Sequence, residues 1–187
     1  MRPLFAVAVT IVFAAAAPAQ DIPSRFEVLY NPDLYKQDSP QDTVNSILGA
    51  IDRGRYDYIV AHLLDPDFVD ARLATTRNYF ERVAAEQIAG SAGGATLKGA
   101  ELENRIREVG QRLNVADLAD RIRKKLLDEP ASVRDLKRFA RDGQYQTAGD
   151  AGSATLKDVK DRALYFKNVK GRWYMENRKE EAPPMKE

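Results

Sequence analysis

The chain has 187 residues, of which 44% are hydrophobic and 30% charged, with 29 lysines and arginines against 28 aspartates and glutamates. This length suits one domain with its own core, and the balanced charge provides no net field that would attract nucleic acid. The absence of cysteine excludes disulfides, thiolate metal sites and cysteine nucleophiles, and a single histidine leaves little room for metal or triad chemistry.

The first residues have the pattern of a secretory signal. Arg2 precedes fourteen mostly apolar residues, 4–17, and Ala17-Pro18-Ala19 provides a small-x-small cleavage pattern. As a helix the apolar run covers about 21 Å, short of the ~30 Å hydrocarbon core, which favours a cleaved signal over a permanent membrane span. We therefore expect cleavage between Ala19 and Gln20 and export to a bacterial periplasm or exterior, where a chain without cysteine is indifferent to redox conditions.

The mature chain is expected to begin with an arm followed by two helices. Residues 20–38 have no sustained hydrophobic period and are interpreted as an N-terminal arm. A helix is expected from Ser39, which suits the N-cap, to Gly54, which suits the left-handed position after a helix. A second helix is expected over 56–64, because the residue before Pro66 avoids helical conformation.

Further helical periodicity follows in the middle of the chain. Thr75-Thr76 is expected to cap a third helix. Apolar spacing predicts a fourth helix over 102–113 and a fifth over 115–126, with the break at Asn114 or Val115. We interpret the region from about 99 to 128 as a helical pair inserted into the domain.

The last part of the chain changes from helical to strand periodicity. Ser132 is expected to cap a short sixth helix that ends near Ala140, and Lys170-Gly171 is predicted to form a two-residue hairpin turn. The expected strands are 144–148, 153–157, 162–169 and 172–178. These elements predict an α+β domain over 39–178, with N-terminal helices packed on a C-terminal antiparallel sheet, followed by a disordered charged tail over 179–187.

Two segments resemble nuclear-transport-factor-2-like (NTF2-like) domains. Residues 39–69 are similar to their opening helices, which are joined by Gly54-Arg55-Tyr56, and residues 162–177 are similar to their closing aromatic hairpin. The resemblance implies a cone in which a curved sheet wraps on helices around a ligand cavity. The helical pair inserted here leaves open whether that cavity is open or filled. No catalytic residue of the family maps onto this sequence.

The aromatic residues and the single histidine are the candidates for lining such a cavity. The candidate cavity residues are Tyr58, His62, Tyr79, Phe80, Tyr145, Tyr165 and Trp173. His62 has two interpretations: a general base oriented by Asp65, or a partly buried structural histidine, which we favour because no nucleophile accompanies it. For the aromatic residues, core packing is the ordinary role.

A second candidate is a basic surface on the helices. Its residues are Arg121, Lys124, Lys125, Arg134, Lys137, Arg138 and Arg141, at helical spacing. Interleaved acidic residues favour a solvated face over a docking surface, and no aromatic residues are interleaved for base stacking, so no nucleic acid partner is expected. No metal or phosphate motif is present, and we expect neither a metal nor a cofactor.

These observations favour an exported, non-catalytic domain that binds a small ligand or a protein partner in the cell envelope. Two alternatives are a cofactor-free isomerase or cyclase that uses a cavity acid or His62, and an interaction module that uses the basic helices. A homodimer through the sheet is also considered.

The export hypothesis predicts the mass of the mature protein. Protein purified from the exported fraction of its host is expected to begin at Gln20, which intact-mass analysis measures directly. A mass that retains residues 1–19 would refute the hypothesis.

Overall fold

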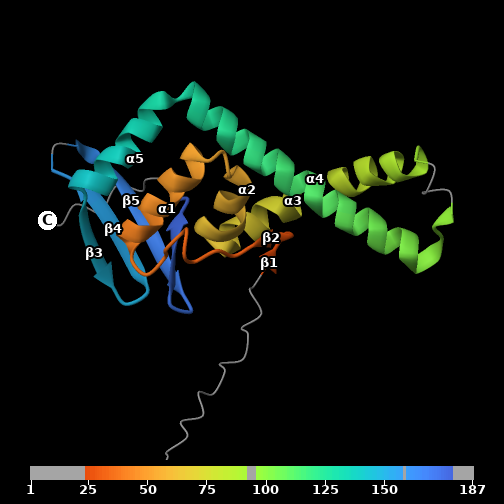
Figure 1. Ribbon diagram of the computed structural model, residues 1–187, viewed down its shortest axis with the longest axis horizontal. Coiled ribbons are helices and arrows are strands. Elements are labelled where there is room, and N and C mark those ends of the chain that lie inside the picture. Colours follow the sequence, from red (N-terminus) through yellow and green to blue (C-terminus); the bar gives the residue numbers. More distant parts are fainter. Residues whose placement is uncertain (1–23, 92–95, 158, 179–187) are drawn as a thin grey trace, which may run out of the picture.

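The structure is a computed structural model that describes residues 24–91, 96–157 and 159–178. The predicted signal segment with its cleavage site and the predicted charged tail lie outside the described residues. From Pro40 to Asp142 the described residues are mostly helical, and a four-stranded antiparallel sheet follows (Figure 1). The expected α+β class is confirmed.

The first two helices begin where the sequence predicts. Helix α1 is Pro40–Asp52; the Ser39 hydroxyl accepts a hydrogen bond from the Asp42 N–H, and Gly54 takes the left-handed conformation with φ +66°. The second helix consists of α2, Tyr56–Tyr58, and a π-helical turn η1, Ile59–Leu63. It ends before Pro66, as expected.

Helix α3, Pro66–Ala89, begins nine residues before the predicted cap at Thr75. Pro66 occupies its first turn, and the Asp65 side chain accepts a hydrogen bond from the Asp67 N–H. The Thr75 and Thr76 hydroxyls bond to the Arg72 carbonyl inside the helix. The Asp-Pro pair that ends one helix therefore also begins the next.

Helix α4, Gly99–Asp128, replaces the two helices and the break predicted at Asn114 or Val115. Asn114 stays helical because its buried side chain bonds across to α3 instead of to its own backbone. Helices α3 and α4 form a long hairpin that extends away from the sheet (Figure 1). The helical pair is thus α3 with α4, and not two helices within 99–128.

Helix α5 is Pro130–Asp142, longer than the predicted sixth helix. Pro130 lies in its first turn, so the cap position falls on Glu129, and Ser132 lies inside the helix with its hydroxyl bonded to Glu129.

The main sheet is an antiparallel meander in the order β3-β4-β5-β6. The strands are β3 Gln144–Ala148, β4 Ala151–Leu156, β5 Val159–Val169 and β6 Arg172–Glu176. Lys170 and Gly171 both have positive φ, 53° and 82°, which is the geometry of a two-residue turn that matches strand twist. The predicted hairpin is confirmed.

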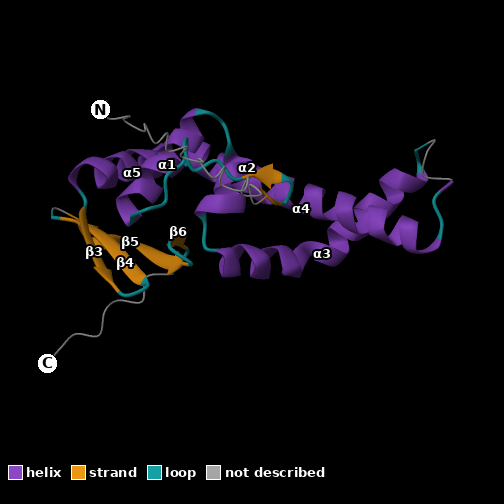
Figure 2. Ribbon diagram, turned by 60° about the horizontal axis from the view of Figure 1, so that its bottom comes forward, coloured by secondary structure: helices purple, strands orange, loops and turns teal. Residues whose placement is uncertain are grey.

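One face of the sheet packs on helices α1 and α5 (Figure 2). Phe166 is fully buried there and Trp173 is 8% exposed, in a cluster completed by Val44 of α1 and Phe139 of α5. An added Cβ on Gly152 would lie 2.9 Å from the Trp173 ring, so this residue has to stay small. Leu164, Phe166, Trp173 and Met175 belong to the inner face, as the alternation predicts.

The described part of the predicted arm is built into the fold. Strands β1, Ser24–Arg25, and β2, Val28–Leu29, form a small hairpin. Tyr35 and Gln37 are buried, at 1% and 2% exposure. Leu29, by contrast, is 65% exposed.

Gln37 joins the helices to the edge of the sheet. Its Nε2 donates to the His62 carbonyl at 2.8 Å and to the Trp173 carbonyl at 2.7 Å. The Trp173 N–H donates to the Gln37 carbonyl at 3.0 Å, and the Asp65 N–H donates to the Met175 carbonyl at 2.9 Å. The β6 edge is thereby covered by residues of the helical half.

Removal of the Trp173 side chain tests this core. Trp173→Ala is expected to reduce the free energy of unfolding by about 3–5 kcal/mol, because it leaves a cavity between the sheet and α1. Urea unfolding measures the change. A loss below about 1 kcal/mol would contradict the core placement.

Candidate functional site

A hollow of about 450 Å³ lies where the helical hairpin, α1, α5 and the end of β6 meet; we call it the junction hollow. It is lined by Ile47, Ile59, Leu64, Phe68, Arg72, Leu118, Arg121, Ile122, Lys125, Leu126, Leu136, Met175, Glu176 and Asn177. Nine of these fourteen residues are apolar. A concave, mostly apolar space of this size is typical of small-molecule sites.

The junction hollow lies along the seam between the three clusters that make up the core. Ile47 and Ile59 belong to the cluster under α1, Leu118 belongs to the cluster between α3 and α4, and Met175 packs against the sheet cluster. Ile47, Ile59 and Leu118 are buried. Leu64, Phe68, Ile122, Leu126, Leu136 and Met175 remain partly exposed, so they are free to contact a ligand.

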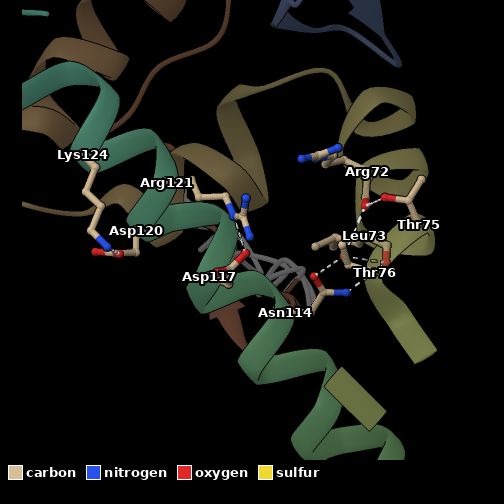
Figure 3. A network of polar contacts seen from close by, with 9 residues as sticks. All are labelled: Arg72, Leu73, Thr75, Thr76, Asn114, Asp117, Asp120, Arg121 and Lys124. Carbon is tan, nitrogen blue, oxygen red and sulfur yellow. Dashed lines mark hydrogen bonds and ion pairs between the residues drawn. The ribbon is translucent and has the colours of Figure 1, made fainter. Parts of the chain in front are cut away.

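Three cationic side chains stand on the hairpin side of the junction hollow. Arg72 comes from α3, and Arg121 and Lys125 come from α4, four residues apart and so on one helical face. Figure 3 shows the Arg72 and Arg121 side chains extending toward the same space between the two helices.

These cations differ in their partners. The Nε–H of Arg121 donates to Asp117 at 2.6 Å, which leaves its terminal amino groups available. Within the described part of the chain, the Arg72 and Lys125 side chains form no ion pair. Glu176, the one carboxylate of the lining, is paired with Arg178. The net charge of the rim is therefore positive.

A polar network fixes the two helices that carry the cations (Figure 3). Asn114 Oδ1 accepts from the Thr76 hydroxyl at 2.8 Å, and Asn114 Nδ2 donates to the Leu73 carbonyl at 2.9 Å. Asn114 is 5% exposed, so these bonds are shielded from water. Near the same level, an added Cβ on Gly110 would lie 3.1 Å from the Glu81 backbone, which shows how closely the helices approach.

A second hollow, of about 560 Å³, lies beside the N-terminal arm. It is lined by residues 27–35 with Arg55, Asp57 and Tyr58. Arg55 and Asp57 pair with each other at 2.9 Å, and the Tyr58 hydroxyl accepts from the Asn31 N–H at 3.0 Å. Its one arginine is thus already paired, and its lining is less apolar than that of the junction hollow, which is therefore the better candidate for a binding site.

His62 occupies an aromatic environment in η1. Its ring centre lies 4.8 Å from that of Tyr58 and 5.5 Å from that of Tyr30. Its Nε2 is 2.8 Å from the Val28 carbonyl, so the neutral ring donates its proton there. Burial lowers the pKa of His62, and Arg172 and Arg25 act in the same direction. This geometry suits a structural histidine.

The predicted cavity residues do not share one space. Tyr58 and His62 lie together, whereas Tyr145 and Trp173 pack in the sheet core. Burial raises the pKa of Tyr58 to about 12. Tyr79 and Phe80 contact each other on α3, with Tyr79 55% exposed.

Tyr165 lies on β5 opposite Glu176, with the Arg178 guanidinium 5.1 Å from its ring centre.

The predicted basic surface is divided by the structure. Arg121 and Lys125 line the junction hollow, and the other five residues do not. Lys124 pairs with Asp120, Arg138 with Asp135 and Arg141 with Asp142. Arg134 and Lys137 are exposed on α5. Local pairing thus neutralises several of these charges.

The acidic residues around the start of α3 have structural partners. Asp65 caps α3, Asp67 pairs with Lys167 at 2.5 Å, and Asp70 pairs with Arg25 at 2.7 Å. Among the described residues, no three histidine or acidic side chains gather as a metal site would require. Nor does any described helix combine the length and apolar character needed to cross a membrane.

Sequence reasoning missed Arg72 and the apolar lining of the junction hollow. The available signal was on α4, where Leu118, Ile122 and Leu126 follow at four-residue spacing beside Arg121 and Lys125. The contribution of Arg72 depends on how α3 packs against α4, which no local pattern gives.

His62 predicts how stability depends on pH. Because its pKa is lowered in the folded state, the unfolded chain binds more protons near the ordinary value of 6.5, so stability is highest above it and falls toward about pH 5.5. The chain has no other histidine, so His62→Gln is expected to remove this dependence between about pH 7.5 and about pH 5.5. Urea unfolding at both pH values measures it; an unchanged slope in the variant would contradict the assignment.

No family model, no curated protein and no solved structure significantly matches this chain, so comparison with known proteins does not assign it to a family. Its function is therefore inferred from the geometry and charge of the junction hollow.

Proposed function

We propose that this protein is a non-catalytic binding protein that holds an apolar small molecule in the junction hollow. The observation that carries the proposal is a space of about 450 Å³ with nine apolar residues among its fourteen lining residues. Side chains that remain partly exposed in this space are covered when an apolar ligand binds, at about 25 cal/mol for each Å² removed from water.

The walls of the junction hollow favour a preformed site. Twelve of its fourteen lining residues lie on α1, η1, α3, α4, α5 and β6, and the other two, Leu64 and Asn177, directly follow η1 and β6. The β6 edge is tied to the helices through Gln37, and α3 is tied to α4 through Asn114. A site that needs little ordering on binding loses less affinity to conformational entropy.

We also propose that the chain is a divergent NTF2-like domain. The proposal is supported by the Ser39-capped helix, the Gly54 turn with its second helix, and the closing hairpin through Lys170-Gly171. In this interpretation the junction hollow is the counterpart of the ligand cavity that the resemblance implies.

Export to the cell envelope remains part of the proposal. It rests on the charged start, apolar run and small-residue end of residues 1–19. A binding protein in that compartment has access to small molecules that enter from outside the cell.

The proposal is tested with a neutral apolar dye, N-phenyl-1-naphthylamine, whose emission rises in apolar surroundings. Saturable binding is expected. Leu126→Trp places a larger side chain in the junction hollow and is expected to weaken dye binding about tenfold or more, because the indole takes up space that the dye would fill.

Leu127→Trp is the matched control. Leu127 is the next residue on the same helix, is 60% exposed and does not line the junction hollow, so this variant is expected to bind the dye like the original protein. Absence of dye binding, or equal binding by the Leu126→Trp variant, would refute the proposed function.

A further inference from the structure

The junction hollow combines apolar and cationic groups. The residues that α1, η1 and α5 contribute are all apolar, whereas α3 and α4 contribute Arg72, Arg121 and Lys125 beside four apolar residues. A purely apolar ligand would leave these three cations without a role. Three cations beside a mostly apolar lining instead match a ligand that is itself amphipathic.

Two of the three cations, Arg72 and Lys125, are not neutralised by the described residues around them, and the third, Arg121, pairs with Asp117. Other cations of α4 and α5 have close acidic neighbours, such as Lys124 with Asp120 at 2.7 Å. By contrast, the side chains of Arg72 and Lys125 form no ion pair within the described residues. Arg121 uses only its Nε–H on Asp117, so its terminal N–H groups can still donate.

The carboxylate of the lining does not cancel the positive charge of the three cations. Glu176 lines the junction hollow at the end of β6, and its partner Arg178 offsets its charge. Among the fourteen lining residues there are three cations and one carboxylate, a formal excess of two positive charges before Arg178 is included. Arginine presents a planar fork of donors that matches an acid group, and lysine adds a point charge.

We propose that the occupant of the junction hollow is a single-chain amphiphile that ends in one acid group. The acid group is held by Arg72, Arg121 and Lys125, and the apolar chain lies on Ile59, Leu118, Ile122, Leu136 and Met175. This inference rests on the proposed function, because it names the class of ligand for the same site.

Two probes with the same ten-carbon chain separate charge from apolar contact. Isothermal titration calorimetry is carried out with decanoate and with decan-1-ol on the purified protein. Decanoate is expected to bind about tenfold more tightly, as charge-assisted hydrogen bonds exceed neutral ones. An increase in salt from about 0.05 M to about 0.5 M is expected to weaken decanoate binding and leave decan-1-ol binding unchanged.

Variants locate the acid group. Arg72→Gln and Lys125→Gln keep two methylene groups of the aliphatic stem and remove the charge, and each is expected to weaken decanoate binding about tenfold with no effect on decan-1-ol. Lys137→Gln is the matched control, because Lys137 is an exposed lysine of α5 that does not line the junction hollow. It is expected to bind both probes like the original protein.

The outcomes distinguish this inference from the proposed function. Equal affinity for decanoate and decan-1-ol would overturn the acid preference and leave the apolar site intact. Decanoate binding that is unaffected by both Arg72→Gln and Lys125→Gln would also overturn it, because the acid group would then lie elsewhere. Absence of binding by either probe, together with absence of dye binding, would refute the proposed function itself.

Discussion

The arrangement of the whole molecule depends on the buried side chain of Gln37. Both N–H groups of its amide are used, one on the His62 carbonyl of η1 and one on the Trp173 carbonyl of β6. Because Gln37 is 2% exposed, water cannot replace these bonds. The amide therefore fixes the distance between the second helix and the edge of the sheet. Ile59 of that helix and Met175 of that strand both line the junction hollow.

The junction hollow lies where two groups of helices meet at one end of the sheet. Helices α1 and α5 lie on the sheet, while α3 and α4 extend away from it, and both groups meet at the end of β6 (Figure 2). The close approach at Gly110 and the Asn114 bonds hold α3 and α4 together. Side chains along such a seam fill it only partly, since their directions are set by two different packing arrangements. The cationic rim follows from the same geometry, because it combines residues of α3 and α4.

Local patterns predicted much of the fold and little of the site. Ser39, Gly54 and the Lys170-Gly171 turn act within a few residues of their own position, so the capped helix and the hairpin could be recognised from sequence. The Asp65-Pro66 pair predicts the end of the second helix. Proline is equally favourable in the first turn of a helix, and the same pair also begins α3. Asn114 was read as a break because its side chain competes with helical backbone bonds, and here that competition is removed by Thr76 and Leu73 of α3. His62 was recognised as a structural candidate, but its partner Val28 lies 34 residues away.

The amino-acid sequence by itself determined the α+β class, the first two helices, the four strands of the main sheet, and the aromatic strand residues that form the core. These follow from propensity, capping and periodicity, which act over a few residues. Only the tertiary structure decided that α3 and α4 form one hairpin, that Gln37 joins the helices to the sheet, and that Arg72 stands beside Arg121 and Lys125 over an apolar hollow. The physical reason is that these features are contacts between residues far apart in the chain, and such contacts are set by how the elements pack on one another.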